Sequence, residues 1–150
     1  MLTFKQTTDL QSQTYNDALM IRQTVFVGEQ QVPAEIEIDD KEASCLHIVT
    51  YNNDGNPIAT GRLYPLDNHI YKVQRVAVLK EERGNSYGSQ LMQGIEQIAA
   101  DKGATRIQLG AQNQALPFYQ QLGYHVIGDE YEDAGIPHHD VEKEILPSHN

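Results

Sequence analysis

The sequence has a single cysteine and no long apolar run, and each shortage excludes a class of protein. Cys45 cannot form an internal disulfide, and its place in an apolar, strand-like run is typical of a packed thiol. The longest apolar runs span only a few residues, too short to cross a bilayer. The first six residues lack a cationic region followed by an apolar stretch, so we expect no secretory signal and a cytoplasmic location.

Cations are also scarce, with 11 Lys and Arg against 21 Asp and Glu, for a net charge of -10. Nucleic-acid binding needs clustered cations that displace counterions, so neither DNA nor RNA is an expected partner. A polyanionic small ligand would need a local exception to this acidic field. The segment 72–83, with several Lys and Arg side chains, offers one.

What is present fits one globular domain covering residues 1–150. The chain is 39% hydrophobic and 21% charged, close to globular averages, and it contains no repeat or linker. The local patterns predict helices over 16–27, 87–102 and 115–122, and strands over 2–6, 45–51, 57–64, 70–79, 105–111, 124–129 and 141–146. Gly28 is expected to end the first helix, and the acidic segment 29–42 reads as a loop. The fold class is therefore α/β (α+β), with strand 70–79 central and parallel to strand 105–111.

The turn Arg83-Gly84-Asn85-Ser86-Tyr87-Gly88 joins the central strand to a helix. Free N–H groups and partial positive charge gather at a helix N-terminus, and glycine lets a phosphate approach the backbone. An ordinary turn followed by a helix start explains the two glycines equally well. Arg83 and nearby Lys80 add fixed positive charge, which favours the anion site.

These residues resemble the GNAT acetyltransferases. Their cradle motif reads Arg or Gln, two residues, Gly, one residue, Gly or Ala, and here Ser86 stands in place of the first motif glycine. A second segment, with Gln112, Phe118 and Tyr119, is similar to the family's second motif. The segments Arg22–Gln30 and Gly135–His138 resemble the narrower ElaA- and YjcF-like branch, so the likeness spans nearly the whole chain.

The resemblance implies a GNAT fold, a mostly antiparallel mixed sheet with a parallel, splayed pair and about four flanking helices. It implies transfer of an acetyl group from acetyl-CoA, used as a cosubstrate, to a primary amine by direct attack in a ternary complex. It also implies a set of cofactor-binding residues, which are Val76, Ala77, Val78, Arg83, Gly84, Asn85, Ser86, Tyr87, Gly88, Ser89, Gln112 and Phe118. Tyr119 matches the position whose hydroxyl serves the leaving thiolate.

The amine must lose a proton before it attacks. An alkylammonium with a pKa of about 10.4 costs about 4.6 kcal/mol to deprotonate at pH 7. Four residues are candidates for the base, namely Glu35, Glu37, Asp39 and His138. A carboxylate of ordinary pKa, near 4, is about six units too acidic for direct transfer, whereas an ordinary histidine near 6.5 is better matched.

Several alternatives remain open at this point. The acidic segment 29–42 suits a cationic small-molecule or peptide amine, and a solvated acidic surface explains it too. The run His138-His139-Asp140 points alternate side chains to opposite faces of an extended segment, so we expect no metal. A non-catalytic acyl-CoA-binding or regulatory module is the rival function, while a P-loop or dinucleotide fold lacks the further residues it needs. A homodimer is neither favoured nor excluded.

Overall fold

The computed structural model describes residues 2–67 and 69–147, and the side chains of Glu35 and Ile36 lie outside that description. The strands are β1 (Thr3–Thr7), β2 (Leu46–Tyr51), β3 (Pro57–Pro65), β4 (Ile70–Val78), β5 (Arg106–Gln112), β6 (His125–Val126), β7 (Tyr131–Asp133) and β8 (Ile136–Glu144). They form one sheet in the order β1-β2-β3-β4-β5-β8-β6, with β7 paired to β8. Only β4 and β5 run parallel among these pairs. The predicted mixed sheet with a central, parallel pair is confirmed.

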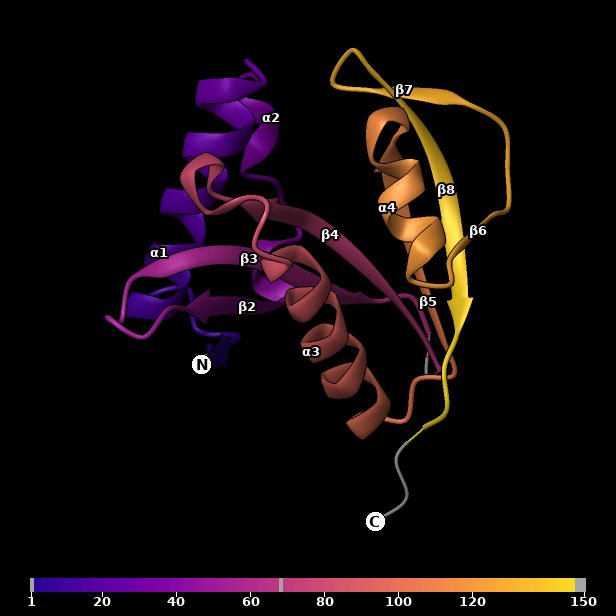
Figure 1. The fold of residues 1–150 in the computed structure, drawn as a ribbon, viewed down its shortest axis with the longest axis horizontal. Coiled ribbons are helices and arrows are strands. Elements are labelled where there is room, and N and C mark those ends of the chain that lie inside the picture. The colour runs from indigo at the N-terminus through magenta and orange to yellow at the C-terminus, as the bar shows by residue number, and fades with distance from the viewer. Residues whose placement is uncertain (1, 68, 148–150) are drawn as a thin grey trace.

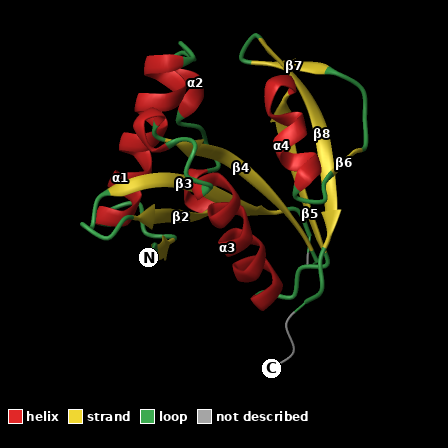
Figure 2. Cartoon of the chain, viewed as in Figure 1, coloured by secondary structure: helices red, strands yellow, loops and turns green. Residues whose placement is uncertain are grey.

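Helices cover both faces of this sheet (Figure 1, Figure 2). They are α1 (Gln13–Arg22), the π-helical segment η1 (Gln23–Glu29), α2 (Ala34–Glu37), α3 (Tyr87–Asp101) and α4 (Leu116–Gln121), with short 3-10 turns η2 (Glu42–Ser44), η3 (Lys80–Glu82) and η4 (Asn113–Ala115). The larger core lies between the sheet and α3 and α4, and a smaller core lies under α1 on the other face. No helix within the described ranges is both long and apolar enough to cross a membrane.

The helix α3 shows how local pattern and packing agree. Its buried residues Leu91, Met92, Ile95 and Ala99 recur at three- and four-residue spacing, so they form one stripe against the sheet. The helix ends where Gly103 adopts a φ of +88° and Ala104 N donates to the carbonyl oxygen of Ala99 at 3.0 Å. The close packing of this helix on β3 and β4 fixes the position of its N-terminus, where the glycine-rich turn ends.

The first helix differs from its prediction at both ends. It begins earlier, at Gln13, where the Ser12 side chain accepts a hydrogen bond from Tyr15 N. It does not end at Gly28, because the chain continues past Arg22 as the wider π-helical turn of η1. Within this segment Gln30 N donates to the carbonyl oxygen of Val25, five residues back, at 3.1 Å. The wide turn carries the end of η1 over the middle of the sheet.

The C-terminal strands were predicted with the wrong bounds. The expected strand 124–129 shrinks to β6, and β8 begins at Ile136, five residues before the expected start at Val141. A two-residue turn explains the difference, since Ala134 and Gly135 both have positive φ and link β7 to β8. Alanine is a rare choice for such a turn, and Pro137 weakened the strand signal. The missed hairpin brings Tyr131 and His138 to the site described next.

Candidate active site

The parallel strands β4 and β5 are hydrogen-bonded to each other only along their first halves. Their pairing runs from Ile70 opposite Arg106 to Val73 opposite Leu109, and no pairing follows. Beyond this point β4 stays paired with β3 to Val78, and β5 stays paired with β8 to Gln112. The two strands separate in Figure 1, and a cavity of about 780 Å³ lies at the split. The splayed pair implied by the resemblance is present, and it leaves one edge of Val76–Val78 without a strand partner.

A bulge in β4 sets the orientation of this open segment. The register between β3 and β4 shifts between Thr60 and Arg62, and Arg75 lies opposite the shift with a φ of +58°. A non-glycine residue with positive φ in a strand carries strain that the surrounding structure must hold. After the bulge, Val76 and Val78 pack toward the larger core and Ala77 toward the smaller one.

The predicted anion cradle lies at one end of the cavity. Gly84 has a φ of +87°, and Ser86, immediately before α3, has a φ of +59°. Ser86 makes no side-chain cap, so the first-turn amides of Tyr87, Gly88 and Ser89 have no capping side chain. A Cβ added at Gly88 would lie 3.2 Å from Phe118 Cζ, so glycine keeps α3 close to α4 here. Free amides and close backbone approach fit a diphosphate.

Arg83, the expected cation of this cradle, is already engaged. Its Nη1 and Nη2 atoms contact the two carboxylate oxygens of Glu29 at 3.0 and 2.8 Å, and its Nε donates to the carbonyl oxygen of Val78 at 3.0 Å. Glu29 is the last residue of η1, and Arg83 follows η3, so the pair joins two separate walls of the cavity. Sequence reasoning did not anticipate this partner.

Tyr119 lies on α4 at the inner wall of the cavity. Its ring packs edge-on against Phe118 and Tyr124, with centroids 5.0 and 5.8 Å away. Burial alone raises the pKa of this hydroxyl above its ordinary value. No described residue accepts a hydrogen bond from it, and its raised pKa keeps the hydroxyl protonated.

His138 lies on β8, across the split from β4, and lines the same cavity. Its Nδ1 contacts the carbonyl oxygen of Ile136 at 2.6 Å, and its ring stacks on Tyr131 with centroids 5.8 Å apart. The hydroxyl of Tyr131 donates to Asp140 Oδ1 at 2.6 Å. A Cβ at Gly110 would lie 2.3 Å from that hydroxyl oxygen, so the glycine of β5 makes room for Tyr131.

Comparison with known proteins identifies the family and the fold. A family model described as an acetyltransferase (GNAT) domain matches residues 10–145. The chain belongs to the GNAT acetyltransferase family. YjcF of Bacillus subtilis, an uncharacterized N-acetyltransferase, is 44% identical over 129 residues, covering 85% of this chain and 91% of YjcF. Crystal structures of a Lactobacillus plantarum protein and of Escherichia coli ElaA match with TM-scores of 0.90 and 0.84 at 30% and 28% identity. They cover 97% and 96% of this chain and 99% and 100% of those chains, so the predicted ElaA-like branch is confirmed.

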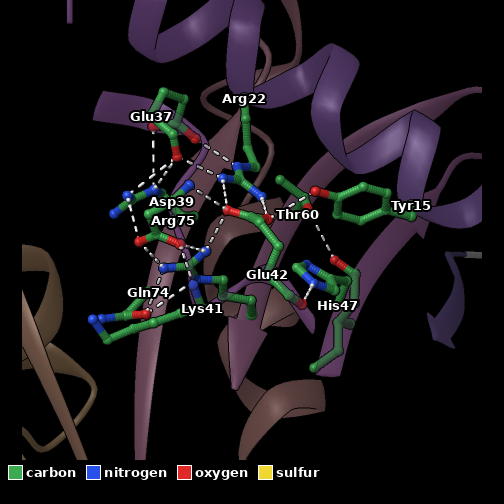
Figure 3. A network of polar contacts seen from close by, with 12 residues as sticks. Tyr15, Arg22, Glu37, Asp39, Lys41, Glu42, His47, Thr60, Gln74 and Arg75 are labelled. Carbon is green, nitrogen blue, oxygen red and sulfur yellow. Dashed lines mark hydrogen bonds and ion pairs between the residues drawn. The ribbon is translucent and has the colours of Figure 1, made fainter. Parts of the chain in front are cut away.

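The acidic segment of this GNAT domain is not a loop throughout, because it contains α2. Three of its carboxylates, those of Glu37, Asp39 and Glu42, enter a network of ion pairs with arginines from α1, β3 and β4 (Figure 3), whereas Glu29 and Asp40 are exposed. Arg22 contacts Glu37 Oε2 at 2.5 Å and Glu42 Oε1 at 2.8 Å, and Arg62 contacts Glu42 Oε2 at 2.8 Å. Burial would raise the pKa of Glu42, but hydrogen bonds and charge from Arg22, with Arg62, lower it to about 2. The network fastens α1 and α2 to the sheet.

The carboxylates predicted as bases take different places in this arrangement. Glu37 is buried and lines the cavity, and its two oxygens contact Arg22 and Arg75, the latter at 3.2 Å. Asp39 pairs with Arg62 and Arg75. Glu35 belongs to α2, but its side chain lies outside the described part of the chain. Both oxygens of Glu37 are thus occupied by guanidinium groups, whereas one ring nitrogen of His138 is not.

Two cavity residues, Gln30 and Arg75, escaped sequence reasoning. Gln30 and Gln112 exchange hydrogen bonds, the shorter at 2.8 Å, across the split, and Arg75 anchors α2 through the carbonyl oxygen of Glu37 at 3.2 Å. Lys72 and Gln74 alternate with apolar neighbours along β4, and Arg75 breaks this alternation, which was the available signal for the bulge. Within the described residues no group of three His, Cys, Asp or Glu side chains is arranged to hold a metal.

Proposed function

We propose that this GNAT domain transfers an acetyl group from acetyl-CoA to a primary amine by direct attack within a ternary complex. The observation that carries the proposal is one continuous cavity. It joins the uncapped start of α3 to the open edge of β4, to Tyr119 and to His138. A GNAT acetyltransferase from Elizabethkingia anophelis that shares this fold was solved with acetyl-CoA bound, which supports the choice of cosubstrate.

The cofactor would lie along the residues that the resemblance assigns. Amides of Tyr87, Gly88 and Ser89 would receive the diphosphate, since a helix N-terminus favours anions. The unpaired edge of Val76–Val78 would hydrogen-bond the extended pantetheine arm as an added strand. Acetyl-CoA supplies an activated thioester, whose acetyl group would then lie near the split between β4 and β5.

Two side chains would move or hold protons at the reacting end. The Tyr119 hydroxyl would donate a hydrogen bond to the leaving sulfur. Because burial raises its pKa, stabilising the developing thiolate is favoured over complete proton transfer. His138 would accept the amine proton at Nε2, because Nδ1 must carry the hydrogen that reaches the Ile136 carbonyl. The guanidinium contacts of Glu37 favour His138 over this carboxylate as the base.

The acceptor is proposed only as a primary amine, cationic in solution and neutral when it attacks. A direct test is an acetyl-CoA assay that detects thiol release over a panel of peptides, polyamines, amino sugars and simple alkylamines. Release that depends on one amine class and rises with its concentration supports the transferase. Binding of coenzyme A without release across the whole panel would instead support a non-catalytic acyl-CoA-binding module, and absent binding would contradict both.

A further inference from the structure

The pair formed by Glu29 and Arg83 lines the same cavity as the proposed diphosphate site. It is bidentate, with the carboxylate oxygens 3.0 and 2.8 Å from the two terminal guanidinium nitrogens. The remaining nitrogen, Nε, donates to the carbonyl oxygen of Val78, on the strand proposed to receive pantetheine. One side chain of η1 therefore engages the cation of the cradle through both of its terminal nitrogens.

This arrangement conflicts with the role proposed for Arg83. A guanidinium paired with a carboxylate presents no net charge, and the carboxylate itself repels an incoming phosphate. The described cavity lining contains two other side chains with a permanent positive charge, those of Lys72 and Arg75. Arg75, on β4, is paired with Glu37 and Asp39. The acidic chain as a whole offers no compensating field. Diphosphate binding must therefore either separate Arg83 from Glu29 or occur against the repulsion of the Glu29 carboxylate.

We propose that Glu29 is a positioning residue that holds Arg83 until the diphosphate of coenzyme A displaces its carboxylate. This inference rests on the proposed function and adds to it an exchange of one anion for another at the same guanidinium. Before binding, the pair links η1 to the segment after η3. After the exchange Arg83 contacts the cofactor, and the Glu29 carboxylate is released at the cavity wall.

The exposure of the pair suits an exchange rather than a permanent brace. The side chains of Arg83 and Glu29 are 44% and 30% exposed, in contrast to the buried pairs of Arg22. Exposed ion pairs contribute little to stability, so thermal motion opens them readily. Competition between the Glu29 carboxylate and the diphosphate for Arg83 should therefore change the affinity for coenzyme A by a few fold, which can be measured.

The test compares coenzyme A with pantetheine, which lacks the diphosphate, by calorimetric titration of Glu29→Gln. We expect coenzyme A to bind to Glu29→Gln about threefold to fivefold more tightly than to the wild type, a gain of at most about 1 kcal/mol. The affinity for pantetheine should be the same in both proteins. Glu82→Gln is the matched control, because Glu82 also lines the cavity and its carboxylate has no partner among the described residues. Its effect should be smaller than that of Glu29→Gln.

A double-mutant cycle with Arg83→Gln separates competition from a general loss of negative charge. In the Arg83→Gln background, Glu29→Gln should give no more tightening than Glu82→Gln does. Weaker binding of coenzyme A to Glu29→Gln, or tightening that survives without Arg83, would overturn the exchange. A wild type that binds no coenzyme A would overturn the proposed function itself, so the two failures are distinguishable.

Discussion

His138 Nδ1 lies 2.6 Å from the carbonyl oxygen of Ile136, two residues earlier on the same strand. A carbonyl oxygen can only accept a hydrogen bond, so Nδ1 carries the hydrogen. In the neutral ring the lone pair then resides on Nε2, and the stacked ring of Tyr131 limits how the imidazole can turn. The backbone of β8 thus selects the tautomer that a general base requires.

Replacing His138 by Gln should lower kcat by about 100-fold or more, the usual contribution of a positioned base. Coenzyme A affinity should not change, because His138 lies across the split from the cradle. The pH dependence of kcat is the sharper measurement. A positioned general base gives kcat an acidic limb, and the variant should lack the limb that we expect of the wild type. A variant that keeps wild-type kcat at every pH would exclude His138 as the base.

Tyr119→Phe removes a hydroxyl that makes no hydrogen bond to a described residue, so its structural cost should be small. We expect kcat to fall about 10- to 100-fold, because a hydrogen bond to a developing charge contributes about 1.5 to 3 kcal/mol. Since burial raises the Tyr119 pKa, the wild-type hydroxyl should stay protonated and active as pH rises past 10. Thermal unfolding and coenzyme A titration serve as controls, and an unchanged turnover number would contradict the role.

Gly110→Ala tests the surroundings of His138 without replacing a polar side chain. The new Cβ would fall 2.3 Å from the hydroxyl oxygen of Tyr131, so that ring must move away from Asp140 and disturb its stack on His138. We predict a lower kcat or a higher KM for the amine, with coenzyme A affinity unchanged. Gly128→Ala is the matched control, because an added Cβ there meets no atom within 4 Å. Equal effects of the two substitutions would contradict the crowding.

Glu42→Gln should destabilise the fold by about 3 to 5 kcal/mol, because it leaves buried Arg22 and Arg62 without a shared carboxylate. Chemical denaturation measures this change, with exposed Glu144→Gln as a control expected to shift stability by less than about 0.5 kcal/mol. The Glu42 pKa is lowered to about 2 in the fold, so its stabilisation is complete above about pH 4.5. Wild-type stability should fall as pH drops from about 4.5 toward 2, and this fall should be weaker in Glu42→Gln.

Substitutions at Ser86 test the departure from the glycine motif. Its φ of +59° is a conformation that glycine adopts freely and β-branched residues strongly disfavour. Coenzyme A should therefore bind to Ser86→Gly at least as tightly as to wild type, and more weakly to Ser86→Val. Ser86→Val should also unfold at a lower temperature. Tighter binding by the valine variant would show that the cradle does not need this backbone shape.

The sequence predicted the elements whose patterns are local. The helix expected over 87–102 and the strands expected over 57–64 and 70–79 each depend on residues near one another, and their positions were correct within a few residues. The glycine-rich turn and Tyr119 were found by resemblance, and both line one cavity. Their chemical roles stay predictions.

The features that sequence reasoning missed all depend on distant partners. Arg22 stood on the apolar face of its predicted helix, yet nothing local indicated that Glu37 and Glu42 would be buried against it. The partner of Arg83 lies 54 residues away, and the fold alone brings Glu29 to it. Arg75 interrupts the alternation of its strand, but only the pairing of β3 and β4 places it at a bulge.

The split between β4 and β5 has a consequence for how the protein meets other chains. A sheet that opens in its interior gains two extra edges, and exposed edges commonly invite another strand and lead to aggregation. Here the opening tapers to the paired residues Val73 and Leu109, and side chains such as Gln30 and Gln112 bridge its walls. Because the two edges converge where Val73 pairs with Leu109, a second sheet cannot pair along the whole length of both. The same geometry should therefore hinder fibril-like association.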